Sequence, residues 1–111
     1  AVYDLIWISG LLIYLNDKRL EKLLANCRAM LSENGRLILR DGTGVPTRYE
    51  INDQYSDALK LNYSALYRTS EEYREEFLKA GFKLVRHDNM FREGHVLNKW
   101  EQTRLRLYEF L

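Results

Sequence analysis

One polar side chain of this sequence, Asp41, could take up the proton that a nucleophile loses as it reacts. Asp41 directly follows the apolar run 36–40, and a carboxylate there could orient an acceptor amine or hydroxyl, or act as its base. An aspartate before a glycine is also an ordinary turn former. Asp41 is a candidate catalytic residue, and we favour a pocket role for it.

A short stretch, Ser9, Gly10 and Leu11, follows the apolar run 2–8. In open α/β sheets ligands gather at the carboxyl ends of strands, so these three residues are candidates for ligand contact. Gly10 could equally serve only to permit a tight exit from the strand.

Three further residues are candidates for substrate binding, namely Arg40, Tyr67 and Arg68. Arg40 ends the run 36–40, and a structural role suits it better. Tyr67 and Arg68 precede a helix start, where such residues often only pack or pair.

Charge and composition argue against several classes of partner. The 17 Lys and Arg residues nearly balance the 16 Asp and Glu residues and are interspersed with them, so no basic stripe indicates nucleic acid. The opening apolar run ends at Leu15 and is interrupted by Asp4, which makes it too short and too broken to span a bilayer. It also lacks the basic start of a signal peptide. We expect neither a membrane nor a nucleic-acid partner.

The histidines and the one cysteine have ordinary interpretations. His87 and His95 have no Cys or second His at ligand spacing, so the sequence predicts no metal site. Cys27 cannot form an internal disulfide and falls on the apolar side of a predicted helix, which predicts a buried thiol. A lone buried thiol suits a reducing compartment, and we expect a cytoplasmic protein.

The hydrophobic pattern predicts an α/β domain. The run 2–8 is almost continuously apolar, as in a strand buried on both faces. Asn16 can cap a helix whose apolar residues recur at helical spacing, and Asn34 with Gly35 can stop it. The run 36–40 is a second strand, and the order strand, helix, strand predicts a right-handed parallel crossover.

The rest of the chain is less regular. Two glycines and the only proline in 41–46 predict a loop that ends the strand and can bring backbone close to a ligand. Residues 47–67 hold four tyrosines without clean periodicity, which indicates an irregular or partly helical lid. Thr69 and Glu72 form a capping box. The remaining expected elements are a helix closed by Gly81, a strand over 82–85, a loop over 87–100 and a strand over 103–111.

Three segments in this order resemble class I S-adenosylmethionine-dependent methyltransferases. Tyr3 to Asp17, Y-D-L-I-W-I-S-G-L-L-I-Y-L-N-D, is similar to the family's fourth strand with the loop and helix that follow. Leu31 to Asp41, L-S-E-N-G-R-L-I-L-R-D, is similar to the turn and fifth strand, with Glu33 and Asn34 in place of the usual Pro-Gly pair. Tyr67 to Phe82 resembles the late helix with its A-G-F exit into the sixth strand. With the closing antiparallel strand that follows, the resemblance extends over nearly the whole chain.

The resemblance implies the C-terminal half of a Rossmann-like sheet, with parallel strands, a final antiparallel strand and flanking helices. It implies S-adenosylmethionine as the cofactor, contacted by Ser9, Gly10 and Leu11, and methyl transfer without a metal to nitrogen or oxygen of a small-molecule or peptide acceptor. Relatives often carry His or Tyr facing the acceptor at the position of Tyr14, so the resemblance makes Tyr14 a second candidate catalytic residue. Packing beneath the following helix suits Tyr14 at least as well. The lid over 47–67 would set the choice of acceptor.

The resemblance also implies that a cofactor-binding N-terminal half is absent. The family's glycine-rich turn and the acidic residue for the ribose hydroxyls occur nowhere in 1–111. We interpret the chain as the C-terminal part of a longer enzyme, which would be a methyltransferase once completed. The alternative is a non-catalytic interaction module. In either case the strand over 2–8 would lie at a sheet edge, which predicts self-association through it.

Overall fold

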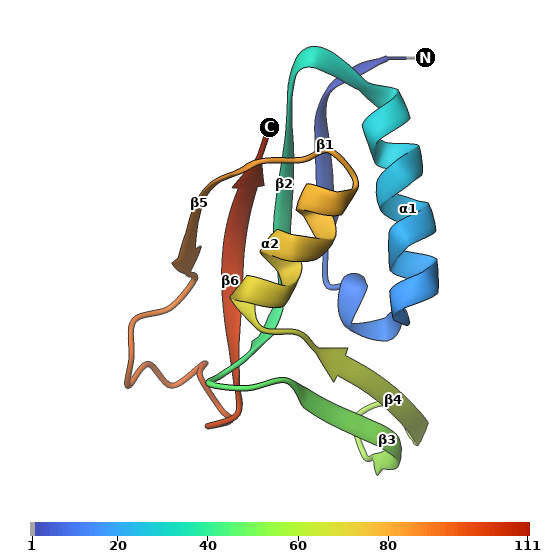
Figure 1. Ribbon diagram of the computed structural model, residues 1–111. Helices are drawn as coiled ribbons and strands as arrows, with labels where there is room; N and C mark the ends of the chain where they lie inside the picture. The colour runs from blue at the N-terminus through green and yellow to red at the C-terminus, as the bar shows by residue number, and fades with distance from the viewer. Residues whose placement is uncertain (1) are drawn as a thin grey trace.

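The computed structural model describes residues 2–111 (Figure 1). The described residues form a four-stranded sheet, a separate two-stranded sheet, two α-helices and one short 3-10 helix. The elements in chain order are β1 (Tyr3–Ser9), η1 (Leu12–Tyr14), α1 (Asp17–Met30), β2 (Leu31–Gly44), β3 (Tyr49–Ser56), β4 (Leu61–Tyr67), α2 (Ser70–Lys79), β5 (Leu84–Asn89) and β6 (Thr103–Phe110).

The larger sheet has the strand order β1-β2-β6-β5. β1 and β2 are parallel and joined through α1, whereas β6 is antiparallel to both of its neighbours, β2 and β5. The predicted α/β class is confirmed, including the βαβ unit and the final antiparallel strand. The last strand in sequence thus lies inside the sheet, and β1 lies at one edge.

Both helices cover the same face of this sheet (Figure 1). Leu24 and Cys27 of α1 and Phe77 of α2 are buried in one core cluster with Leu39 and Phe110 of the strands. The rings of Phe77 and Phe110 stack with centroids 3.9 Å apart. Cys27 is buried as predicted, and its burial raises the pKa of the thiol.

The opposite face of the sheet has no helix over it among the described residues (Figure 1). Side chains alternate along β1, so Ile8 points into the core while Leu5 and Trp7 are 58% and 56% exposed. β1 therefore combines a free edge with large exposed apolar side chains.

Both helices begin at the predicted caps, but α1 ends differently. The Asn16 side chain accepts the Arg19 N–H, and Thr69 with Glu72 forms the capping box. We expected Asn34 and Gly35 to stop the first helix, and this was wrong. Leu31 already has extended backbone angles and pairs with Tyr3 of β1, so the chain passes from helix to strand without a glycine turn.

The second strand also extends further than predicted. Residues 41–44 are not a loop, because β2 keeps pairing with β6 as far as Gly44 opposite Thr103. The later strands shift slightly as well: β5 covers 84–89 rather than 82–85, and the loop between β5 and β6 covers 90–102.

The expected lid over 47–67 is instead the β3–β4 hairpin, which projects beyond the end of the larger sheet (Figure 1). Two glycines of β2 leave room for the base of this hairpin. A Cβ at Gly42 would lie 2.5 Å from the Tyr67 ring, and one at Gly44 would lie 2.5 Å from the Thr47 carbonyl oxygen. These glycines therefore let the hairpin lie close to β2, and the predicted close approach of a ligand stays a prediction. None of the helices within residues 2–111 is long and apolar enough to cross a membrane.

Candidate functional site

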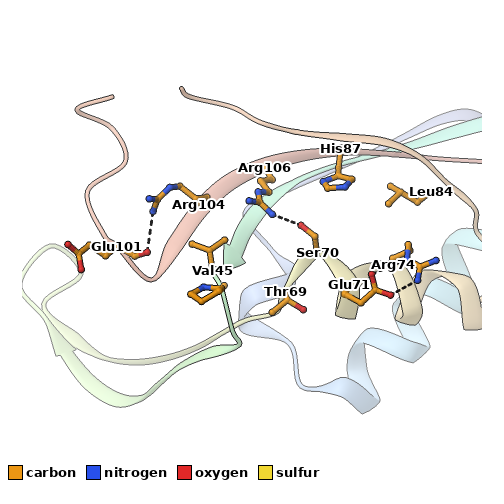
Figure 2. Close-up of a pocket in the computed structure, with 12 residues that line it drawn as sticks. Val45, Thr69, Ser70, Glu71, Arg74, Leu84, His87, Glu101, Arg104 and Arg106 are labelled. Carbon is orange, nitrogen blue, oxygen red and sulfur yellow. Dashed lines mark hydrogen bonds and ion pairs between the residues drawn. The ribbon is translucent and has the colours of Figure 1, made fainter. Parts of the chain in front are cut away.

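Two separate hollows border the strand ends. The larger, of about 740 Å³, lies among the first turn of α2, β5 and β6 and is lined by none of the candidate catalytic residues (Figure 2). The smaller, of about 210 Å³, lies where β1 and β2 end, which is the side of a parallel sheet that binds ligands. We call the smaller one the strand-end pocket, lined by Gly10, Ile13, Asp41, Gly42, Tyr67, 97–100 and 103–105.

Asp41 anchors the backbone that leaves β1. Its side chain is fully buried, and Oδ2 accepts the Leu12 N–H at 2.7 Å and the Leu11 N–H at 3.1 Å. Oδ1 accepts the Gly42 N–H at 2.9 Å. Burial raises the pKa of this carboxyl, and the three backbone hydrogen bonds oppose that rise. Asp41 lines the strand-end pocket, but its first partners are peptide groups of the protein.

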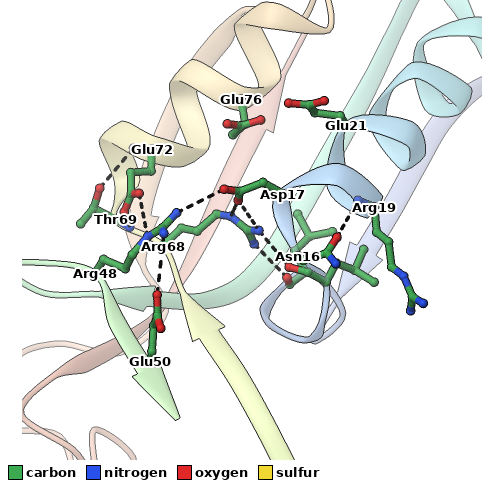
Figure 3. Close-up of polar contacts among 12 residues, drawn as sticks. Asn16, Asp17, Arg19, Glu21, Arg48, Glu50, Arg68, Thr69, Glu72 and Glu76 are labelled. Carbon is green, nitrogen blue, oxygen red and sulfur yellow. Dashed lines mark hydrogen bonds and ion pairs between the residues drawn. The ribbon is translucent and has the colours of Figure 1, made fainter. Parts of the chain in front are cut away.

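Arg68 holds the same segment from its other side (Figure 3). The guanidinium is fully buried, and it donates from Nη1 to the Leu12 carbonyl at 3.0 Å and from Nη2 to the Leu15 carbonyl at 2.8 Å. It also pairs with Asp17 at 2.8 Å, and this hydrogen bond is the main cause that lowers the pKa of Asp17. The predicted contact of Arg68 with a substrate stays a prediction, because the observed partners of its guanidinium are the η1 backbone and Asp17.

A second cation borders this cluster. Arg48, which precedes β3, lies 2.9 Å from Glu72 and 3.7 Å from Asp17 (Figure 3). It thereby links the base of the hairpin to the first turns of α1 and α2.

Aromatic side chains line the outer part of the site. Tyr67 and Trp100 line the strand-end pocket and also a neighbouring pocket of about 90 Å³ beneath the hairpin. Burial is the main cause that raises the pKa of Tyr67 to about 12, so its phenol is neutral at physiological pH. We call the second space the aromatic pocket, and its lining is uncharged: Tyr49, Ile51, Gln54, Tyr63, Tyr67, Trp100, Gln102 and Thr103.

The structure therefore brings together only some of the predicted site residues. Gly10, Asp41 and Tyr67 line one pocket. Tyr14 is half-exposed and lines a different hollow between η1 and the hairpin, so its catalytic role stays a prediction. Arg40 donates to the Ser9 hydroxyl at 3.3 Å, which is consistent with the structural role that we favoured for it.

The remaining pocket residues were not singled out as a site from sequence. Ile13, Gln54 and Gln102 belong to no recognisable sequence motif. Trp100 lines both the strand-end pocket and the aromatic pocket. Within residues 2–111, no three His, Cys, Asp or Glu side chains are grouped to hold a metal ion.

Comparison with known proteins shows the fold. No protein-family model matches the chain. A S-adenosylmethionine-dependent methyltransferase of Leishmania major matches 99% of it with a TM-score of 0.69 at 22% identity. The 1,6-didemethyltoxoflavin N1-methyltransferase of Burkholderia thailandensis, solved with S-adenosylhomocysteine, matches 99% with a TM-score of 0.73 at 17% identity. A pericyclic reaction enzyme matches 98% with a TM-score of 0.65 at 15% identity.

These matches define both the fold and its extent. The chain has the Rossmann-like fold of part of a class I S-adenosylmethionine-dependent methyltransferase domain. It spans 39%, 44% and 26% of those three chains, in that order, and so less than half of each. One fold thus occurs in proteins described both as methyltransferases and as a pericyclic reaction enzyme, so the activity has to be argued from the site.

Proposed function

We propose that these 111 residues form the acceptor-side part of a longer S-adenosylmethionine-dependent methyltransferase that methylates a nitrogen or oxygen atom. The observation that carries the proposal is the double anchoring of the segment after β1. Asp41 and Arg68 fix Leu12 from two sides, which places Gly10 and η1 against a pocket at the carboxyl end of the sheet. The methyltransferase neighbours support the assignment of this pocket to methyl transfer.

The residues at the end of β1 fit one side of the cofactor. Ser9, Gly10 and Leu11 are exposed, Gly10 has a positive φ of 64°, and nothing lies within 4 Å of the place where its Cβ would be. In our proposal these three residues contact the cofactor, and the glycine-rich turn and ribose-binding acid belong to a segment outside these residues. When bound, S-adenosylmethionine supplies a methyl group that its positive sulfur activates.

The protein's part in the reaction is mainly positioning. Tyr67 and Trp100 line the strand-end pocket, where they would hold the acceptor in line with the methyl carbon and keep water out. As the acceptor atom bonds to that carbon and the carbon–sulfur bond breaks, the acceptor loses a proton. Asp41 would orient the acceptor through a remaining carboxyl lone pair, and its raised pKa favours accepting that proton.

The pocket volumes favour a compact reacting group. The strand-end and aromatic pockets measure about 210 and 90 Å³, which suits a small molecule or a single side chain of a peptide. The second candidate function is a non-catalytic interaction module. The observation that favours it is the exposed apolar face of β1, which offers Leu5 and Trp7 to a partner.

Calorimetric titration with S-adenosylhomocysteine separates the two functions. We would compare the 111-residue chain with a chain that also carries the residues preceding Ala1 in its gene. Binding by the extended chain, lost when Gly10 is replaced by a bulky residue, supports the methyltransferase. Absence of binding by both chains contradicts it and favours the module. If the 111-residue chain already binds without the preceding residues, our proposal that those residues hold most of the cofactor is wrong.

A further inference from the structure

Three guanidinium groups line one cavity of the structure. Arg74 comes from α2, and Arg104 and Arg106 come from β6, all around a space of about 740 Å³ (Figure 2). His87 of β5 lines the same space. This arginine cavity shares only Arg104 with the strand-end pocket and lacks Asp41, Gly10 and Tyr67. It is therefore a second candidate site, and its role does not depend on methyl transfer.

Two of the three arginines are already neutralised by a carboxylate. Arg74 pairs with Glu71 one helical turn away. Arg104 pairs with Glu93 at 2.8 Å and also donates to the Trp100 carbonyl at 2.8 Å. Both interactions compete with any ligand, so these side chains are poor candidates to hold one by themselves.

Arg106 differs because its hydrogen bonds all go to uncharged groups. Its Nε donates to the Asn89 side-chain oxygen at 2.6 Å, and its Nη1 donates to the Ser70 hydroxyl at 2.7 Å. No Asp or Glu carboxylate within residues 2–111 forms an ion pair with it. The carboxylate of Glu101 lies at the far end of the arginine cavity and points away from Arg106 (Figure 2).

The surroundings hold Arg106 in place. The Ser70 hydroxyl lies 2.8 Å from the Tyr108 hydroxyl, which in turn lies 2.6 Å from the buried Thr43 hydroxyl. The His87 ring stacks on the Tyr108 ring with centroids 5.6 Å apart and so forms a fixed wall of the cavity. A guanidinium that is held in advance loses less freedom when it binds a ligand.

We propose that the arginine cavity binds the oxyanion group, a phosphate or a carboxylate, of a small molecule, with Arg106 as the main contact. Guanidinium pairs with such groups through two parallel N–H bonds, and the Nη2 atom of Arg106 has no hydrogen-bond partner in residues 2–111. The hydroxyl of Ser70 and the ring of His87 line the cavity beside it and complete a polar wall. The negative charge of the ligand meets a guanidinium whose own hydrogen bonds go only to uncharged groups.

Titration followed by NMR tests this site on the 111-residue chain. Inorganic phosphate and acetate are added separately at constant ionic strength, with sodium chloride as the blank, while the Ser70 and His87 backbone amides are monitored. We expect saturable shifts with one dissociation constant for at least one of the two anions. Saturation by phosphate, acetate or both supports the proposal and identifies the preferred group. Shifts that stay linear for both anions, or match the chloride blank, overturn it.

Three variants assign the effect to Arg106. Arg106→Gln should weaken binding about tenfold or more, since it removes a charge-assisted contact. Arg106→Lys should keep part of the affinity because it keeps the charge. Arg86→Gln is the matched control, because it removes the same charge from β5 at a side chain that pairs with Glu109 at 3.2 Å. An affinity of Arg106→Gln within twofold of the wild type, or an equal loss in Arg86→Gln, overturns the proposal.

Discussion

Asp41 and Arg68 bind opposite ends of the same residue, Leu12. The Leu12 N–H donates to Asp41 at 2.7 Å, and the Leu12 carbonyl accepts from Arg68 at 3.0 Å. Asp41 lies on β2, Arg68 lies between β4 and α2, and both side chains are fully buried. The Leu12 carbonyl also accepts the Leu15 N–H at 3.1 Å within η1, so the segment after β1 is held by its own turn and by these two buried side chains.

Removing the guanidinium should therefore destabilise the fold. Arg68→Met removes the side-chain donor of the Leu15 carbonyl and one of the two donors of the Leu12 carbonyl, and we expect the free energy of unfolding to fall by about 3 kcal/mol. Urea unfolding followed by circular dichroism measures this. Arg48→Met is the control. Arg48 is more exposed, so its replacement should lower the free energy of unfolding by less than about 1 kcal/mol. Equal losses in the two variants would contradict the anchoring role of Arg68.

The dependence of stability on pH should show contributions of opposite sign from two aspartates. The hydrogen bond from Arg68 lowers the pKa of Asp17 below 3.8, so its contribution is complete above that value and is lost as the pH falls through the folded pKa. Burial raises the pKa of Asp41 above 3.8, so its contribution is present below that value and is lost as the pH rises through the folded pKa.

Unfolding free energies at a series of pH values check both signs. Asp17→Asn should reduce the loss of stability on the acid side, whereas Asp41→Asn should reduce the loss on going from acid toward neutral pH. The difference between each variant and the wild type is the quantity to compare. Two difference curves with the same sign of slope would show that one of these assignments is wrong.

The contact between Gly42 and Tyr67 should be visible in a double-mutant cycle. Gly42→Ala places a methyl group 2.5 Å from the Tyr67 ring, and we expect it to cost about 1–3 kcal/mol and to move the ring. In a Tyr67→Ala background the same change should cost clearly less, because the ring is gone. Urea unfolding of the four proteins gives the coupling energy. Additive costs would mean that the ring does not oppose the methyl group.

Self-association through β1 is the fourth prediction. The strand is at the sheet edge, and Leu5 and Trp7 are more than half exposed. We expect light scattering after size exclusion to show dimers or larger species at high concentration. Leu5→Lys with Trp7→Lys should restore the monomer, whereas lysines at the exposed Leu59 and Leu61 of the hairpin region should not. A wild-type chain that stays monomeric at high concentration would contradict the prediction of self-association through β1.

Local signals in the sequence determined the βαβ unit and the two helix starts. The apolar run of β1, the Asn16 cap and the capping box of Thr69 with Glu72 act through neighbours a few residues away, so their types and spacing are enough to predict them. The same holds for buried Cys27, which follows from its place on the helix face. The candidate residues Gly10, Asp41 and Tyr67 were also recognisable as residues that follow strands or precede a helix.

Only the tertiary structure decided what those residues contact. Asp41 accepts a hydrogen bond from Leu12, 29 residues away in the sequence, and Arg68 donates one to the same residue, 56 residues away. No local sequence pattern predicts either bond. The extension of β2 to Gly44 depends on pairing with β6, more than fifty residues later, and the hairpin over 49–67 depends on the space that Gly42 and Gly44 leave. Long-range pairing and close packing overrode the turn signals that the two glycines give locally, because a satisfied strand ladder outweighs turn propensity, whereas Pro46 lies just beyond the end of β2.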